Sequence, residues 1–228
     1  MIDWHTHVLP NIDDGSKSVE ESLSLLQMLK NQGIQTVIAT PHFLPQKCSV
    51  NEFLEKREQA YALLQPSLSN ELPKIKLGAE VAYYEGISRL EGLNFLRIQG
   101  SKILLLEMPY KDWTEYAVNE VLSLAHFGNV IPMIAHVERS LTKRNVLAVK
   151  RLALEGVLFQ TNASYVLDNK RKATKLLKSK MVHTIGSDCH NLIYRAPNVG
   201  DAYAWLEKKF GLSFCQAFNS LGRSLLND

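Results

Sequence analysis

The stretch IDWHTH at residues 2–7 is a short apolar run that carries two histidines and leads into DDG at residues 13–15. In an extended strand, side chains two positions apart point to the same face of the sheet. His5 and His7 therefore share one face of the expected strand, where two imidazoles can bind one metal ion. Asp14 can reach the same place from the following loop. Taken alone, such a histidine pair is more often an ordinary pair of surface or core residues.

Later apolar runs predict further strands, and most of them end at or beside a residue that can bind metal. These runs lie at 35–40 (QTVIAT), 75–80 (IKLGAE), 103–107 (ILLLE), 130–136 (VIPMIAH), 157–162 (VLFQTN) and 182–187 (VHTIGS). Helices are predicted between the strands. Ser18 and Glu21 have the spacing of a capping box at the start of the first helix, and Asn51 is the expected cap of the second.

Strands that alternate with helices predict a parallel sheet with crossover helices. Seven such units in one domain favour a closed α/β barrel over an open sheet, and in such barrels the chemistry lies at the C-terminal ends of the strands. The residues at these ends are His5, His7, His42, Glu80, Glu107, His136, Asp188 and His190. Each of them alone has an ordinary structural explanation, but chance rarely gathers so many metal-binding residue types at one rim. His126 and His183 fall elsewhere and are expected to be structural.

The types of these residues indicate which metal the rim would bind. Imidazoles and carboxylates without thiolates suit manganese, iron or zinc better than calcium. The set is too large for a single ion, so the sequence predicts a cluster of two or three ions.

Length and composition limit the other classes of protein. The 228 residues, 46% of them hydrophobic, fit one domain over 1–228, with no linker or fixed repeat. A formal net charge of +3 does not indicate nucleic-acid binding. We expect no signal peptide, because Asp3 and His5 follow the first residues at once, and no membrane insertion, because no apolar run reaches the length of a span. Three cysteines, few and odd in number, favour a reducing cytoplasm.

Together these motifs resemble the PHP (polymerase and histidinol phosphatase) superfamily, over nearly the whole chain. The matching stretches are His5-Thr6-His7, Asp13-Asp14-Gly15, residues 39–42 (ATPH), 78–80 (GAE), 134–139 (IAHVER) and 187–191 (SDCHN). Within that superfamily, the segments 13–15, 136–139 and 188–195 are most similar to the bacterial capsule-cluster tyrosine phosphatases. Cys189 is a departure, because we expect Met or Ala between the aspartate and the histidine.

The resemblance implies a distorted (βα)7 barrel that binds three metal ions, manganese first, with iron or zinc as alternatives. By motif, the first ion is bound by His5, His7, Glu80 and Asp188, the second by Glu80, Glu107 and His136, and the third by Asp14, His42 and His190. The match at Glu107 rests on strand position. The implied reaction is hydrolysis of phosphotyrosine on protein, by attack of a metal-bridging hydroxide on phosphorus. The implied substrate is the tyrosine-rich tail of a capsule or exopolysaccharide kinase.

Two arginines are the expected catalytic partners of the metals. Arg139 follows His136 by three residues and Arg195 follows His190 by five, so both should lie on loops at the metal rim. A planar guanidinium can hold the phosphate oxygens that face away from the metals. The alternative is that each arginine pairs with a nearby carboxylate, such as Glu138, and only orders its loop.

Two rival interpretations stay open from the sequence, and one chance pattern is rejected. Cys189 to Arg195 matches the C-x5-R pattern of cysteine-dependent phosphatases, but its interior is bulky and lacks glycine, which argues against a phosphate-binding loop. Another phosphoesterase, such as a histidinol phosphatase or a nuclease-like relative, is one rival. A metal-stabilised regulatory protein without turnover is the other. The basic segment 169–180 is expected to be a solvated face, with docking of an acidic partner as the second interpretation. The sequence does not fix the oligomeric state.

Overall fold

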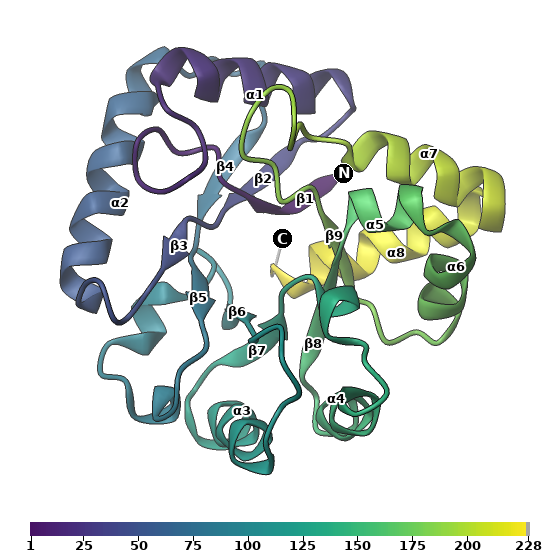
Figure 1. The fold of residues 1–228 in the computed structure, drawn as a ribbon. Helices are drawn as coiled ribbons and strands as arrows, with labels where there is room; N and C mark the ends of the chain where they lie inside the picture. The colour runs from purple at the N-terminus through teal and green to yellow at the C-terminus, as the bar shows by residue number, and fades with distance from the viewer. Residues whose placement is uncertain (227–228) are drawn as a thin grey trace.

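The computed structural model describes residues 1–226, in which parallel strands curl around a centre and helices cover the outside (Figure 1). The strands are β1 (Ile2–Thr6), β2 (Thr36–Ala39), β3 (His42–Phe43), β4 (Lys74–Leu77), β5 (Glu80–Ala82), β6 (Ile103–Glu107), β7 (Ile131–Ile134), β8 (Leu158–Asn162) and β9 (Thr184–Gly186). The helices are α1 (Val19–Asn31), α2 (Val50–Leu64), α3 (Glu115–Phe127), α4 (Asn145–Leu154), α5 (Ala163–Asp168), α6 (Lys170–Lys178), α7 (Val199–Phe210) and α8 (Leu212–Leu225).

All the strand pairs are parallel, as the alternation of strands and helices predicts. They form one sheet in the order β1-β2-β4 and a second in the order β3-β5-β6-β7-β8-β9. Backbone hydrogen bonds continue from one sheet into the other, because Gly78 N donates to Ala39 O over 2.8 Å and Glu80 N donates to Pro41 O over 3.0 Å. At the opposite edge Asp188 N donates to His5 O over 2.8 Å. The fold is therefore a curled parallel sheet.

Alternating side chains of the strands pack on two sides of this sheet. Leu104 and Leu106 of β6 belong to the large core between the sheet and the helices. Ile103 and Leu105 belong to a smaller cluster on the inner side, together with Ile2, Trp4, Ile38 and Met133. Because side chains two apart share a face, Glu107 continues the inner row of β6 at its C-terminal end. The apolar alternation thus directs a carboxylate toward the centre of the curl.

One predicted strand differs from the structure in a way that matters for the site. The stretch 75–80 is not one strand that ends in a carboxylate: it is split at Gly78 and Ala79 into β4 and β5. Glu80 therefore begins β5 instead of ending a strand. The neighbouring stretch is split in the same way at Thr40 and Pro41, and Pro41 has no N–H to donate to a neighbouring strand. His42 consequently lies in β3 and pairs in register with Glu80.

Two details of the helices also correct the sequence prediction. The cap of α2 is Ser49 instead of Asn51, and it forms a capping box with Glu52. The segment 163–168, which was not predicted as a helix, forms α5 directly after β8. Ser18 does cap α1 and accepts a hydrogen bond from Glu21 N, but Glu21 Oε2 accepts from Lys17 N instead of Ser18 N, so the predicted capping box is only half formed. Among the described residues, no helix combines the length and the apolar character that a bilayer crossing needs.

Candidate metal centre

The two histidines of the opening stretch meet two carboxylates from distant parts of the chain. His5 Nε2 and His7 Nε2 lie 3.2 Å apart at the end of β1. Glu80 Oε2 is 3.1 Å from His5 Nε2 and 3.4 Å from His7 Nε2. Asp188 Oδ1 is 3.7 Å and 3.5 Å from the same two nitrogens. All four side chains are buried, and their nitrogen and oxygen atoms face one another without an intervening side chain.

Glu80 extends this group toward β6 and β7. Its other oxygen, Oε1, lies 2.9 Å from His136 Nε2, and that nitrogen is 3.4 Å from Glu107 Oε1. Glu80 Oε2 also lies 2.9 Å from His42 Nδ1. Both oxygens of one buried carboxylate are thus shared among four imidazoles, which is the position that a bridging ligand takes.

A third group lies where the loop after β1 approaches the centre. Asp14 Oδ1 is 3.4 Å from His42 Nε2 and 3.3 Å from His190 Nε2. Asp14 is largely exposed, in contrast to the other carboxylates of the site. The His7 and His190 rings lie 3.9 Å apart, centroid to centroid, so this third group is continuous with the first.

The structure therefore brings every predicted metal-binding side chain into one cluster, which we call the nine-residue cluster. Its members are His5, His7, Asp14, His42, Glu80, Glu107, His136, Asp188 and His190. The two histidines expected to be structural lie outside it. His126 pairs with Glu155 at the surface, and His183 Nδ1 accepts a hydrogen bond from Phe159 N.

Burial and charge act against each other in this cluster. Burial raises the pKa of Glu80, but the charge of His5 and the hydrogen bonds from His136 and His42 outweigh it and hold that pKa well below its usual range. Burial lowers the pKa of His136, and hydrogen bonds to Glu107 and Glu80 more than offset it, so that the pKa rises to about 9. Burial likewise lowers the pKa values of His7 and His42, but their hydrogen bonds to carboxylates outweigh it and raise them. A divalent cation would replace the protons on these imidazoles, since metal ligands bind deprotonated.

His190 differs from His7, His42 and His136, whose pKa values are raised. Burial lowers its pKa, and the positive charges of His7 and Arg195 lower it further, to about 4. His190 is therefore neutral at physiological pH, which is the form that binds metal. Its Nδ1 lies 3.0 Å from the carbonyl oxygen of Asp188 and donates to it in the tautomer that leaves Nε2 free to face Asp14.

The backbone at two members of the cluster is in an unusual conformation. His136 has φ 32° and Asp188 has φ 55°, although neither is glycine. Left-handed backbone at residues other than glycine is uncommon and costs energy, and such residues often gather at functional sites. In both cases it occurs just after a strand, where it turns the side chain back into the cluster.

Several residues that support the cluster were not assigned a role from the sequence. Asp13 Oδ2 accepts a hydrogen bond from His7 Nδ1 over 2.7 Å and another from the backbone N–H of His42 over 3.0 Å. Burial raises the pKa of Asp13, but the hydrogen bond and charge of His7 dominate and lower it to about 2. Its ionised carboxylate fixes which nitrogen of His7 faces the cluster. The sequence did contain a signal for this role, because Asp13 directly precedes the predicted ligand Asp14 in the same motif.

A second supporting residue is Asn162, at the end of β8. Its Nδ2 donates to Asp188 Oδ2 over 2.9 Å, and its backbone N–H donates to Glu138 Oε1 over 3.1 Å. Glu138 also accepts from Thr161 Oγ1. Only the strand position of Asn162 hinted at this role, because its partners are distant in sequence.

The two predicted catalytic arginines both reach the cluster. Arg139 donates to Asp188 Oδ2 over 2.9 Å and to the hydroxyl of Tyr110 over 2.6 Å. Arg195 lies 2.6 Å from Asp188 Oδ1. Neither pairs with Glu138, which was the named alternative partner, although each does pair with a carboxylate in this structure. Both side chains remain partly exposed, so their guanidinium groups lie at the open edge of the cluster.

Cys189 is unsuited to nucleophilic chemistry. The side chain is 0% exposed and belongs to the apolar core. Burial, followed by the negative charge of Asp3, raises the pKa of its thiol far above the ordinary value. A reactive cysteine needs a cationic, accessible setting that lowers this pKa. The match to C-x5-R is therefore a coincidence of sequence, as the bulky interior of the segment indicated.

The donor set of the cluster fits bound metal ions. It combines imidazole nitrogens and carboxylate oxygens, which suit manganese, iron and zinc. Two buried atoms that face the centre, Glu80 Oε2 and His190 Nε2, have charged neighbours at 2.9 Å and 3.3 Å but make no hydrogen bond of good geometry within the described residues. Buried polar atoms without a partner are costly, and a coordinated ion removes that cost.

Comparison with known proteins gives a consistent result. Over residues 1–221 the chain matches the protein family described as capsular polysaccharide synthesis, CpsB/CapC. It is 31% identical to the tyrosine-protein phosphatase CpsB of Streptococcus pneumoniae, over 92% of this chain and 91% of that protein. It is 32% identical to the tyrosine-protein phosphatase YwqE of Bacillus subtilis, over 92% of this chain and 85% of the relative.

A solved structure agrees with these matches. It comes from a crystallographic study of YwqE and CpsB, which describes them as unique metal-dependent tyrosine phosphatases. Its TM-score with this chain is 0.82, at 25% sequence identity, and the match covers 100% of this chain and 94% of the solved chain.

Proposed function

The chain belongs to the CpsB/CapC family, and from this membership and the geometry of its site we propose that it is a metal-dependent protein-tyrosine phosphatase. The observation that carries the proposal is the nine-residue cluster, in which both oxygens of Glu80 are shared among four imidazoles. A buried carboxylate in that position is suited to bridge two cations. Such a cluster at the strand ends of an α/β fold is an expected place for phosphate-ester chemistry.

We assign the ligands in three overlapping sets, for two to three ions, with Mn²⁺ as the expected metal and iron or zinc as alternatives. His5, His7, Glu80 and Asp188 would hold the first ion, Glu80, Glu107 and His136 the second, and Asp14, His42 and His190 the third. Contacts of 2.9 to 3.7 Å within the sets support the grouping. His42 Nδ1 also lies 2.9 Å from Glu80 Oε2, so the third set adjoins the other two. Bound ions would activate water for attack on phosphorus and neutralise charge on the phosphate oxygens.

The protein's own residues supply the remaining functions. Arg139 and Arg195 would move from Asp188 to the phosphate oxygens, for which the planar guanidinium offers paired hydrogen bonds. Their partial exposure at the open edge supports this assignment. Asp13 orients His7, and Asn162 orients Asp188, so the ligands are held in place before substrate binds.

The substrate class follows from the family. We propose a phosphotyrosine protein, most simply the tyrosine-rich tail of a bacterial capsule kinase, and no nucleic-acid substrate. Phosphotyrosine is made from ATP, so we place the reaction in the cytoplasm. The three cysteines, all free in the structure, fit that reducing compartment.

We also infer that the curled sheet is a distorted (βα)7 barrel. The segments β2 and β3 follow each other along one path, as do β4 and β5, so the nine short strands occupy seven strand positions. The bridge between Thr6 and Cys189 supports closure between β1 and the end of β9. If closure holds in solution, the amide hydrogens of His7 and Asp188 should exchange as slowly as those inside β6.

A substrate panel with elemental analysis tests the proposed function. The purified protein should contain a transition metal, lose activity on chelation and recover it with Mn²⁺. It should hydrolyse a phosphotyrosine peptide faster than histidinol phosphate or short DNA. Faster hydrolysis of one of the other two would assign a different phosphoesterase activity. Metal content without any turnover would assign a regulatory protein.

A further inference from the structure

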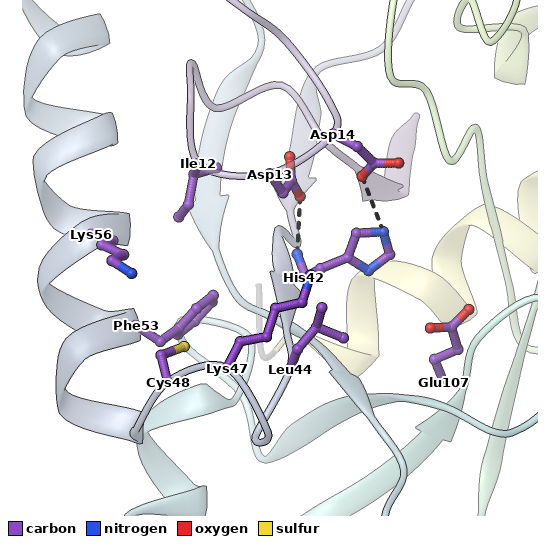
Figure 2. A pocket seen from close by; sticks show the side chains of 10 residues that line it. All are labelled: Ile12, Asp13, Asp14, His42, Leu44, Lys47, Cys48, Phe53, Lys56 and Glu107. Carbon is purple, nitrogen blue, oxygen red and sulfur yellow. Dashed lines mark hydrogen bonds and ion pairs between the residues drawn. The ribbon is translucent and has the colours of Figure 1, made fainter.

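A cavity of about 520 Å³ opens directly beside the nine-residue cluster (Figure 2). Its lining comes from the loop after β1, the loop between β3 and α2, the first turns of α2 and the end of β6. The lining residues are Ile12, Asp13, Asp14, His42, Leu44, Lys47, Cys48, Phe53, Lys56 and Glu107. Three of them, Asp14, His42 and Glu107, also belong to the cluster, so the cavity and the proposed metal centre share one wall.

Away from the cluster, the wall of the cavity includes three apolar side chains. Ile12, Leu44 and Phe53 provide hydrocarbon and ring surface there, and Figure 2 shows Ile12 and Phe53 on one side of His42 with Glu107 on the other. A phosphate held at the cluster must carry its ester group away from the metals. An apolar wall adjoining His42 suits an aromatic ester group, because such a ring gains from burial against apolar surface.

Two cations border the same cavity. Lys47 lies in the loop before α2 and Lys56 on α2, and both are exposed. Neither forms an ion pair within residues 1–226, whereas Lys30, Arg144 and Arg151 each pair with a carboxylate. Lys56 does have a carboxylate one turn away on α2, because its charge, after the hydrogen bonds from Ser49, helps to lower the pKa of Glu52. The acidic residues of the cavity do not neutralise them: Asp14 and Glu107 face the imidazoles of the cluster, and Asp13 is bonded to His7. The rim therefore offers positive charge to an incoming group.

We propose that this cavity is the peptide subsite, in which the phosphotyrosine ring packs on Ile12, Leu44 and Phe53 while Lys47 and Lys56 select an acidic residue beside it. The inference rests on the proposed phosphatase function and specifies its substrate: a phosphotyrosine flanked by aspartate or glutamate. Two exposed charges act weakly and are screened by salt, so the preference is modest and depends on ionic strength.

The test compares two phosphotyrosine peptides of the same length, one with glutamates next to the phosphotyrosine and one with glutamines. We expect kcat/KM of the unaltered protein to favour the acidic peptide by about three- to tenfold, the range for one or two exposed ion pairs. In the double variant Lys47→Ala/Lys56→Ala this ratio should fall to about one. Added salt should reduce the ratio in the unaltered protein but not in the variant.

A matched control uses two exposed lysines that lie outside the cavity. Lys170→Ala/Lys172→Ala on α6 removes the same charge and should keep the preference for the acidic peptide. Equal ratios in the unaltered protein, or a full preference in the Lys47→Ala/Lys56→Ala variant, would overturn the subsite.

The same peptides with a non-hydrolysable phosphonate in place of phosphate separate this proposal from the proposed function. Their binding is measured by fluorescence polarisation, which needs no turnover. Tighter binding of the acidic phosphonate peptide that depends on Lys47 and Lys56 would support the subsite even if no peptide were hydrolysed. Absence of hydrolysis would then count against the phosphatase function alone, and equal binding of both peptides would count against the subsite alone.

Discussion

Replacing Glu80 by glutamine tests the proposed metal centre most directly. The change keeps the size of the side chain and removes its charge. Glu80 Oε2 lies 3.1 Å from His5, 3.4 Å from His7 and 2.9 Å from His42, while Oε1 lies 2.9 Å from His136. In our assignment, Glu80 belongs to two of the three ligand sets. This one substitution should therefore weaken the binding of two ions at once, and only the ligand set of Asp14, His42 and His190 should stay complete.

The expected magnitude follows from that sharing. The metal content, measured by elemental analysis after dialysis, should fall from two or three ions per chain to about one. The reason is that a neutral amide is a poor substitute for a carboxylate ligand. Turnover of phosphotyrosine peptide should drop by about a thousandfold or more, because metal ions in such sites contribute several kcal/mol to transition-state stabilisation.

Glu120→Gln is the matched control. Glu120 is also a buried carboxylate, but it accepts hydrogen bonds from Gly86 N and from Ser88, away from the cluster. This variant should lose some stability and keep its metal content. If Glu80→Gln retained the metal content and turnover of the unaltered protein, the assignment of Glu80 as a bridging ligand would be wrong.

Four further substitutions probe the residues around the ligands. Arg139→Lys and Arg195→Lys should lower kcat/KM by about tenfold to a thousandfold and leave metal content and thermal midpoint nearly unchanged. Lysine keeps the positive charge but cannot donate the two parallel hydrogen bonds of a guanidinium. Reduced stability with unchanged kinetics would instead show that both arginines are structural. Asp13→Asn should weaken metal affinity by about 10- to 100-fold in a metal titration, the usual loss when the partner of a ligating histidine is removed; unchanged affinity would show that Asp13 does not support His7. Cys189→Ser should keep most activity, and native Cys189 should resist iodoacetamide; a variant that binds phosphopeptide but cannot hydrolyse it would refute the metal mechanism.

The sequence predicted most of this architecture because its signals are local. The strand ILLLE at 103–107 appears with those bounds, and its alternation between the two apolar clusters is the reason that Glu107 faces the centre. The convergence of the metal-binding residue types also follows from one rule: in a parallel sheet that curls, the C-terminal ends of the strands meet. The sequence alone could therefore predict that nine residues from seven segments lie at one rim, without knowledge of any distance.

Other features depend on contacts that no local pattern contains. The split of the stretch 75–80 at Gly78 and Ala79 reflects how β5 aligns with β3 and β6, so an apolar run alone predicted one strand. Glu80 was placed at the correct rim for the wrong reason, since it begins β5 instead of ending a strand. The hydrogen bond from Asn162 to Asp188 joins residues 26 positions apart, and no spacing rule predicts such a pair.

Two glycines show how closely the rest of the chain is fitted to the opening stretch. A Cβ at Gly186 would lie 2.5 Å from the Cβ of His5, and one at Gly15 would lie 2.3 Å from the carbonyl oxygen of His7. No side chain fits at those distances, so β9 and the loop after β1 can approach the two histidines only because both positions are glycine. Asp188 lies two residues after Gly186, and Asp14 directly precedes Gly15, so each close approach brings a carboxylate to the imidazoles. The candidate metal centre around His5 and His7 therefore depends on the absence of side chains at Gly186 and Gly15 as well as on the ligands themselves.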